Sequence, residues 1–162
     1  MSGRDVRRLA GRASNMTHEA KRDMVARLAA GADALGVDEI LIVREPFSIA
    51  EKALQHMKLK AKVRVLDLPV TNSAKDSENA VEAFIDLGCR TIVSLGGDGT
   101  NRAIVRSQPN INLLPISTGT NNVFPMMVEP TLVGMAASLI ASESLDELTR
   151  HALSRKVKAV SY

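Results

Sequence analysis

Apolar residues along this chain switch between helical spacing and short strand-like runs. From residue 16 to 35 they recur every three or four positions between Thr17, a suitable N-cap, and Gly36, which predicts an amphipathic helix. Apolar, β-branched runs predict strands that begin near residues 37, 63, 90 and 111. Further helices are predicted over residues 48–57, 76–87, 100–107 and 130–141.

This alternation of strands and helices is typical of consecutive right-handed βαβ crossovers. It predicts an α/β fold, an open parallel sheet with helices on both faces. The strand over residues 90–95 is apolar on both faces, as a central strand covered from two sides is expected to be. Beyond residue 141, a capping box at 144–147 predicts a last helix, and weak alternation over 156–162 resembles the start of another strand. We therefore expect one α/β domain over 1–155, with 156–162 as a tail or the start of a second domain.

Composition and charge narrow the classes of function. The chain has 162 residues, enough for one domain, and a formal net charge of +3. The positive charge lies at the two ends, whereas residues 28–149 hold ten basic and fifteen acidic side chains. A continuous basic face is therefore not expected, and three Phe, one Tyr and no Trp give little material for base stacking. We expect no nucleic-acid partner.

Cysteine, histidine and hydropathy bear on compartment and metal binding. The single Cys89 excludes an internal disulfide framework and fits a reducing compartment. No apolar run reaches the length of a membrane span, so a cytoplasmic protein without a membrane span is expected. His18, His56 and His151 lack the spacing of metal ligands, and we predict no metal site built from them.

The strongest chemical signal is a glycine-rich loop placed where a buried strand ends and a helix begins. That edge is where open α/β sheets bind ligands, and glycines let backbone N–H groups approach an anion closely. The loop has no Walker lysine, and Arg102 stands where a dinucleotide fingerprint needs its third glycine. A carboxylate beside phosphates points to phosphoryl transfer, although Asp98 as a plain helix cap remains the alternative. The residues are Gly96, Gly97, Asp98, Gly99, Thr100 and Asn101.

A second polar loop follows the next predicted strand. This loop, within residues 115–125, offers hydroxyls, two amides and a glycine, which supply neutral donors to phosphate or ribose oxygens. Because both loops follow parallel strands, we expect them to lie together at one sheet edge. An ordinary Asn/Gly/Thr-rich connection is the alternative for this loop taken alone. The residues of this loop predicted to contact nucleotide are Thr118, Gly119, Thr120 and Asn121.

Together, Gly96-Gly97-Asp98-Gly99-Thr100 and Gly119-Thr120-Asn121 resemble the nucleotide-binding half of the superfamily of NAD kinases, diacylglycerol kinases and sphingosine kinases. The segment 119–125 and Glu129-Pro130-Thr131 look most like the acetoin catabolism protein X branch of ATP-NAD kinase-like proteins. The similarity extends over nearly the whole chain.

The resemblance implies an ATP- and Mg²⁺-dependent kinase with a hydroxyl acceptor, NAD being the first candidate, with a link to acetoin catabolism and a homo-oligomeric state. It assigns phosphate contacts to the glycine loop, nucleotide contacts to 118–121, and to Asp98 the role of base or Mg²⁺-side carboxylate. A lipid kinase is one alternative, which Asn122 disfavours because lipid kinases usually carry Asp there. A non-catalytic nucleotide-binding accessory protein is the other.

The resemblance also implies that the family's first strand and its C-terminal β-rich domain are missing from this chain. Residues 2–3 match the end of the turn that follows that strand. Because the family's acceptor site lies between the domains, we expect the chain alone to bind nucleotide weakly and to be nearly inactive.

Overall fold

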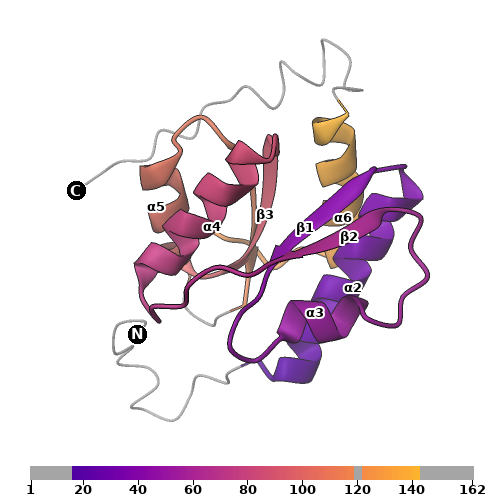
Figure 1. Cartoon of the computed structure of the whole chain (residues 1–162), viewed down its shortest axis with the longest axis horizontal. Helices are drawn as coiled ribbons and strands as arrows, with labels where there is room; N and C mark the ends of the chain where they lie inside the picture. Colours follow the sequence, from indigo (N-terminus) through magenta and orange to yellow (C-terminus); the bar gives the residue numbers. More distant parts are fainter. Residues whose placement is uncertain (1–15, 119–121, 143–162) are drawn as a thin grey trace.

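The structure, a computed structural model, describes residues 16–118 and 122–142 (Figure 1). The elements are α2 (His18–Ala34), β1 (Glu39–Val43), α3 (Ile49–Leu54), β2 (Lys62–Leu66), α4 (Ala74–Asp86), β3 (Thr91–Gly96), α5 (Asp98–Ser107), β4 (Asn112–Ser117) and α6 (Pro130–Ala141). Each helix and strand expected between residues 16 and 141 is present, with its ends within three residues of those predicted. The helix expected after 144 and the strand expected over 156–162 lie outside the described residues.

Local sequence explains where the helices begin and end. The Thr17 hydroxyl accepts from the Ala20 N–H at 3.1 Å, and Gly36 follows α2 with φ of 82°, a left-handed conformation that suits glycine. Helix α4 starts two residues earlier than predicted because Ser73 and Asp76 form a reciprocal capping box. Hydrogen bonds, first from the Thr71 hydroxyl, lower the pKa of Asp76.

The strands form two parallel pairs, β1 with β2 and β3 with β4. The α/β class with parallel strands is confirmed, but within the described residues no hydrogen-bonded ladder joins the two pairs into the single open sheet that we expected. Side chains connect them instead, because Leu95 of β3 packs against the same apolar cluster as Ile40 and Ile42 of β1.

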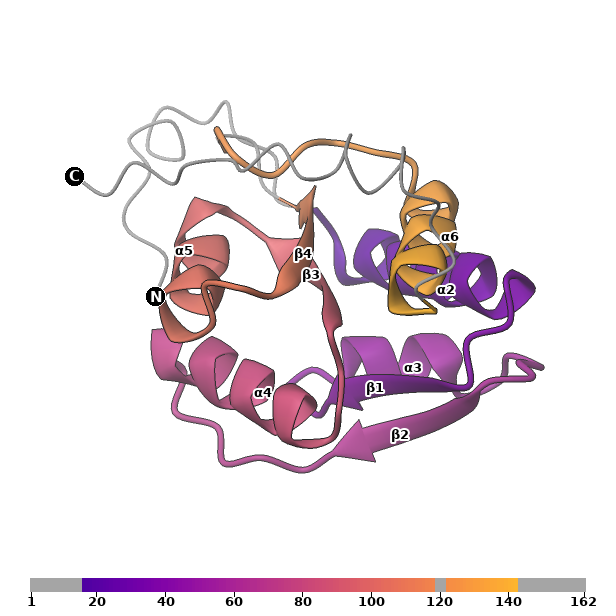
Figure 2. The same cartoon turned by 90° about the horizontal axis from the view of Figure 1, so that it is seen from above.

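Helices cover both faces of the β3–β4 pair, as predicted. In Figure 2, α4 and α5 lie on one side of it and α2 and α6 on the other, with α3 beside β1. One core cluster, centred on Val81, Ile92 and Ile104, fills the space between β3 and the α4–α5 layer. The other, around Val25, Ala29 and Leu54, lies under α2 and α3. The β3–β4 pair is therefore fixed from both sides up to its carboxyl edge.

Helices α2 and α6 cross with their backbones in close approach. A Cβ on Gly134 would lie 2.0 Å from the Leu28 carbonyl oxygen, and one on Gly31 would lie 2.1 Å from the Thr131 oxygen. Glu129 caps α6 by accepting from the Leu132 N–H at 3.0 Å and pairs with Arg27 of α2. Desolvation raises the pKa of Glu129, but these hydrogen bonds and the Arg27 charge outweigh it, so the pKa is lowered. This crossing joins segments about a hundred residues apart.

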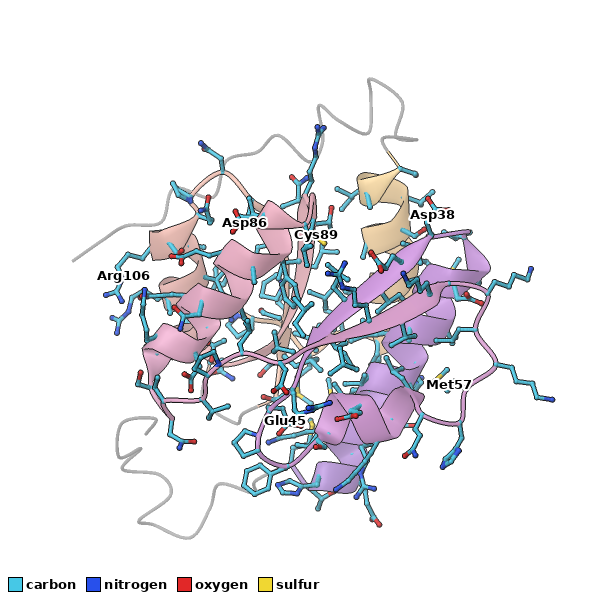
Figure 3. All side chains as sticks on the ribbon, viewed as in Figure 1. Asp38, Glu45, Met57, Asp86, Cys89 and Arg106 are labelled. Atoms are coloured by element: carbon cyan, nitrogen blue, oxygen red, sulfur yellow. The ribbon has the colours of Figure 1, made fainter. Side chains whose placement is uncertain are left out.

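Cys89, just before β3, is expected to react slowly with iodoacetamide (Figure 3). Burial, followed by the negative charge of Glu39, raises the pKa of its thiol, and only the thiolate is a good nucleophile. Unfolding in urea at pH 8 is expected to accelerate alkylation by about tenfold. Because folding raises the pKa of Cys89, the contribution of the neutral thiol to the free energy of unfolding is fully present below the ordinary thiol pKa. It is lost as the pH rises through the pKa of the folded state. Equal rates in the folded and unfolded chain would contradict the prediction.

Among the described residues, no helix combines the length and apolar character required to cross a membrane.

Candidate functional site

The two polar loops start side by side at the carboxyl edge of the β3–β4 pair. Gly96, the last residue of β3, is the register partner of Ser117, the last residue of β4. The prediction that both loops meet at one sheet edge is therefore confirmed. Of the predicted site residues, the structure brings together Gly96–Asn101 and Thr118, whereas Gly119, Thr120 and Asn121 lie outside the described residues.

The glycine loop turns the chain directly from β3 into α5. A Cβ on Gly96 would lie 2.8 Å from the Thr100 Cβ, and one on Gly97 would lie 2.7 Å from Asn122 Oδ1 and displace that carboxamide. Gly99, in contrast, has open space where a Cβ would point. Within the described part of the chain, the N–H groups of Gly99 and Thr100 contact no acceptor. The first turn of α5 therefore presents free donors beside an unobstructed glycine, which suits a bound anion.

Asn101 stabilises the glycine loop through two side-chain hydrogen bonds. Its side chain is 2% exposed, accepts from the Ser94 hydroxyl at 2.5 Å, and donates to the Gly97 carbonyl at 2.9 Å. Because that carbonyl only accepts, the orientation of the amide is fixed. In this geometry both ends of the Asn101 side chain are used within the protein. Its predicted contact with nucleotide remains a prediction.

Asp98 joins the two loops. Its carboxylate accepts from the Phe124 N–H at 2.9 Å and from the Val123 N–H at 3.0 and 3.2 Å. A carboxylate has about four lone-pair sites, so these contacts leave it able to accept a further proton or to meet a cation. Asp98 is thus both a clamp on the second loop and a charged group at the sheet edge.

Asn122 completes the contact from the other side; it belongs to the second loop but is not one of the predicted site residues. Its Oδ1 accepts from the Asp98 N–H at 3.3 Å, and its Nδ2 donates to the Ser117 hydroxyl at 2.8 Å. The sequence identifies Asn122 as one of the two amides of the second loop and as the residue that replaces an aspartate of lipid kinases. Its place in that loop, at the same sheet edge as Asp98, is the signal that points to it.

A metal-ligand cluster and a cavity are the other features that could mark a site. Within residues 16–118 and 122–142, no cluster of three or more His, Cys, Asp or Glu side chains is placed to hold a metal ion. A cavity of about 540 Å³ lies elsewhere, between α3 and the β1–β2 pair, where Figure 3 labels Met57. Its lining is largely apolar and shares no residue with the glycine loop.

These features define an α/β domain with a glycine loop at its sheet edge, where the N–H groups of Gly99 and Thr100 are free to donate. The sequence profile of the ATP-NAD kinase N-terminal domain matches residues 10–144, and the chain belongs to that family. It is similar to Acetoin catabolism protein X of Cupriavidus necator, with 34% identity over 149 residues, which cover 88% of this chain and 42% of that protein. No solved structure gives a significant match.

Proposed function

We propose that this chain is the nucleotide-binding domain of a cytoplasmic kinase that transfers a phosphoryl group from Mg·ATP to a hydroxyl acceptor, with NAD as the first candidate. The observation that carries the proposal is the start of α5, where the unbonded N–H groups of Gly99 and Thr100 lie next to the carboxylate of Asp98. Membership of the ATP-NAD kinase family supports ATP as the donor.

In this proposal the two loops divide the nucleotide between them. The glycine loop and the positive end of the α5 dipole bind phosphate oxygens, and residues 118–121 donate to the remaining phosphate or ribose oxygens. No Walker lysine is present, so backbone N–H groups carry the phosphate contacts. Phosphate binding by such a loop does not depend on which hydroxyl acceptor is used. The proposal of NAD as the acceptor therefore rests on the family alone.

Asp98 is the residue we propose for the chemistry. Mg²⁺ is commonly held by one or two carboxylates together with substrate phosphates and water, so one carboxylate at this edge fits a phosphate-bound ion. When bound, the ion would neutralise charge on the transferred phosphoryl group. The Asp98 carboxylate would contact that ion or take the proton of the attacking hydroxyl.

The chain spans less than half the length of the relative that it matches, and that relative is named for acetoin catabolism. We therefore propose that catalysis by the whole protein uses further residues beyond this domain, and that its pathway is linked to acetoin breakdown. A non-catalytic nucleotide-binding accessory protein is the second candidate. It is favoured by the existing use of the Asp98 carboxylate as a clamp on Val123 and Phe124.

Gly99→Ala tests the site. The added methyl group meets no atom within 4 Å, so the midpoint of thermal unfolding is expected to stay the same or rise slightly. The methyl group would stand where an anion approaches the loop, and loss of one charge-assisted hydrogen bond is expected to weaken Mg·ATP binding by about tenfold. Titration calorimetry measures the Mg·ATP affinity of the wild-type and Gly99→Ala proteins. Ala30→Ser, which adds one heavy atom at an exposed position of α2, is the control. Unchanged affinity in Gly99→Ala would count against this loop as the phosphate site.

A further inference from the structure

We infer that Asn122 is the positioning residue of Asp98: it holds the Asp98 backbone so that the carboxylate stays at the sheet edge. This inference rests on the proposed function for its kinetic consequence. Its structural basis is a reciprocal set of hydrogen bonds between the two loops. The Asn122 side chain accepts from the Asp98 N–H, and the Asp98 carboxylate accepts from the N–H groups of the two residues after Asn122.

The backbone contact comes first. The N–H of Asp98 lies at the start of α5, where no intrahelical acceptor is available, and Asn122 Oδ1 accepts from it at 3.3 Å. Because an N–H only donates, the oxygen of the amide must face Asp98. The Nδ2 then faces Ser117, to which it donates at 2.8 Å. The Asn122 side chain is thereby held at both ends, between the start of α5 and the end of β4.

The carboxylate contact is the counterpart. Asp98 accepts from the N–H groups of Val123 and Phe124, the two residues after Asn122. Main chain and side chain of Asp98 are therefore both fixed by residues 122–124. Without Asn122, only the Asp98 carboxylate would still bond to the second loop, through the N–H groups of Val123 and Phe124, and Val123 is 95% exposed.

Gly97 gives independent support. The three nearest heavy atoms that a Cβ on Gly97 would meet all belong to Asn122, the closest being Oδ1 at 2.7 Å. Gly97 has φ of −104°, which other residues adopt freely, so its lack of a side chain is needed for space and not for backbone conformation. The absence of a side chain at Gly97 thus leaves the space that the Asn122 carboxamide occupies.

The test compares Asn122→Ala, Gly97→Ala and the double variant in the intact protein. Asn122→Ala is expected to lower kcat for phosphoryl transfer from ATP by roughly 10- to 100-fold, because a misplaced reacting group slows the chemical step, with KM for ATP changed by less than about threefold. Gly97→Ala displaces the carboxamide and is expected to act in the same direction. In the double variant the added methyl group has room, so its kcat is expected to match that of Asn122→Ala alone.

Asn110→Ala, the same change at an exposed turn between α5 and β4, is the control and is expected to leave kcat unchanged. A rise in KM at unchanged kcat, unchanged kinetics, or additive effects in the double variant would overturn the inference. If Asn122→Ala does not fold, the Gly97→Ala result decides in its place.

Amide hydrogen exchange separates this inference from the proposed function. Protection of the Val123 and Phe124 N–H groups is expected to fall by about tenfold in Asn122→Ala, because Asp98 no longer holds them in one position. If the wild-type protein transfers no phosphoryl group, the proposed function fails, and loss of protection at both amides still supports Asn122 as the residue that positions Asp98. Unchanged protection would refute it.

Discussion

In the full-length protein, Asp98→Asn is expected to reduce phosphoryl transfer by at least a hundredfold while leaving the fold and nucleotide binding intact. An amide is a poor base and a weak ligand for Mg²⁺, and a positioned general base contributes about 10²- to 10⁴-fold to rate. An amide oxygen in the Oδ1 position can still accept from the Val123 and Phe124 N–H groups, but an NH₂ group replaces Oδ2, the other acceptor of Val123, so the clamp between the loops is weakened by about 1–3 kcal/mol. Transfer of labelled phosphate from ATP to NAD measures the rate, and calorimetry measures the affinity for ATP.

Asp86→Asn, at the C-terminal end of α4, makes the same chemical change away from the loops and is expected to leave transfer unchanged (Figure 3). An Asp98→Asn protein with normal turnover would remove Asp98 from the chemistry. A wild-type protein that binds ATP but phosphorylates no acceptor would favour the non-catalytic candidate, with Asp98 serving as the clamp.

Local pattern was sufficient to predict the helices, the strands and the meeting of the two loops. Periodicity and end signals such as Thr17 and Pro130 act over a few residues, and parallel strands bring their carboxyl ends to one edge whatever the rest of the chain does. The division of the sheet into two pairs was not predictable, because the run over residues 37–43 indicates a strand but not which strands pair with it. The capping box of α4 was missed since Ser73 lies outside the apolar repeat that was used to place the helix.

The site shows the same limit. The glycine loop can be recognised from its residue types alone. The role of Asn122 depends instead on its contact with Asp98, 24 positions earlier in the sequence. Its neighbour Asn121 has the same side chain, so residue type alone does not separate them. Asn101 was predicted as a ligand because it belongs to the motif, yet the structure buries it between Ser94 and Gly97. Which amide faces the ligand side is decided by the three-dimensional contacts of the loops.

Gly134→Ala is expected to cause the largest loss of stability, about 2–3 kcal/mol in the free energy of unfolding. Alanine is normally favoured over glycine in a helix by about 1 kcal/mol, so intrinsic preference predicts a gain. The added methyl group would stand 2.0 Å from the Leu28 carbonyl oxygen, which belongs to the backbone and cannot rotate away. Helices α2 and α6 must therefore move apart, and overpacking of this kind typically costs 1–3 kcal/mol. Urea denaturation monitored by circular dichroism measures the change.

Gly31→Ala probes the same crossing from α2, where the methyl group would lie 2.1 Å from the Thr131 oxygen. Because separation of the helices relieves both contacts at once, the double variant is expected to lose less than the sum of the single variants. Gly99→Ala is the matched control, since it makes the same substitution in a helix with open space and is expected to lose no stability. If Gly134→Ala were as stable as this control, the backbones of α2 and α6 could not approach as closely as the 2.0 Å contact implies. Packing on α2 would then not fix the position of α6 or of the second polar loop that precedes it.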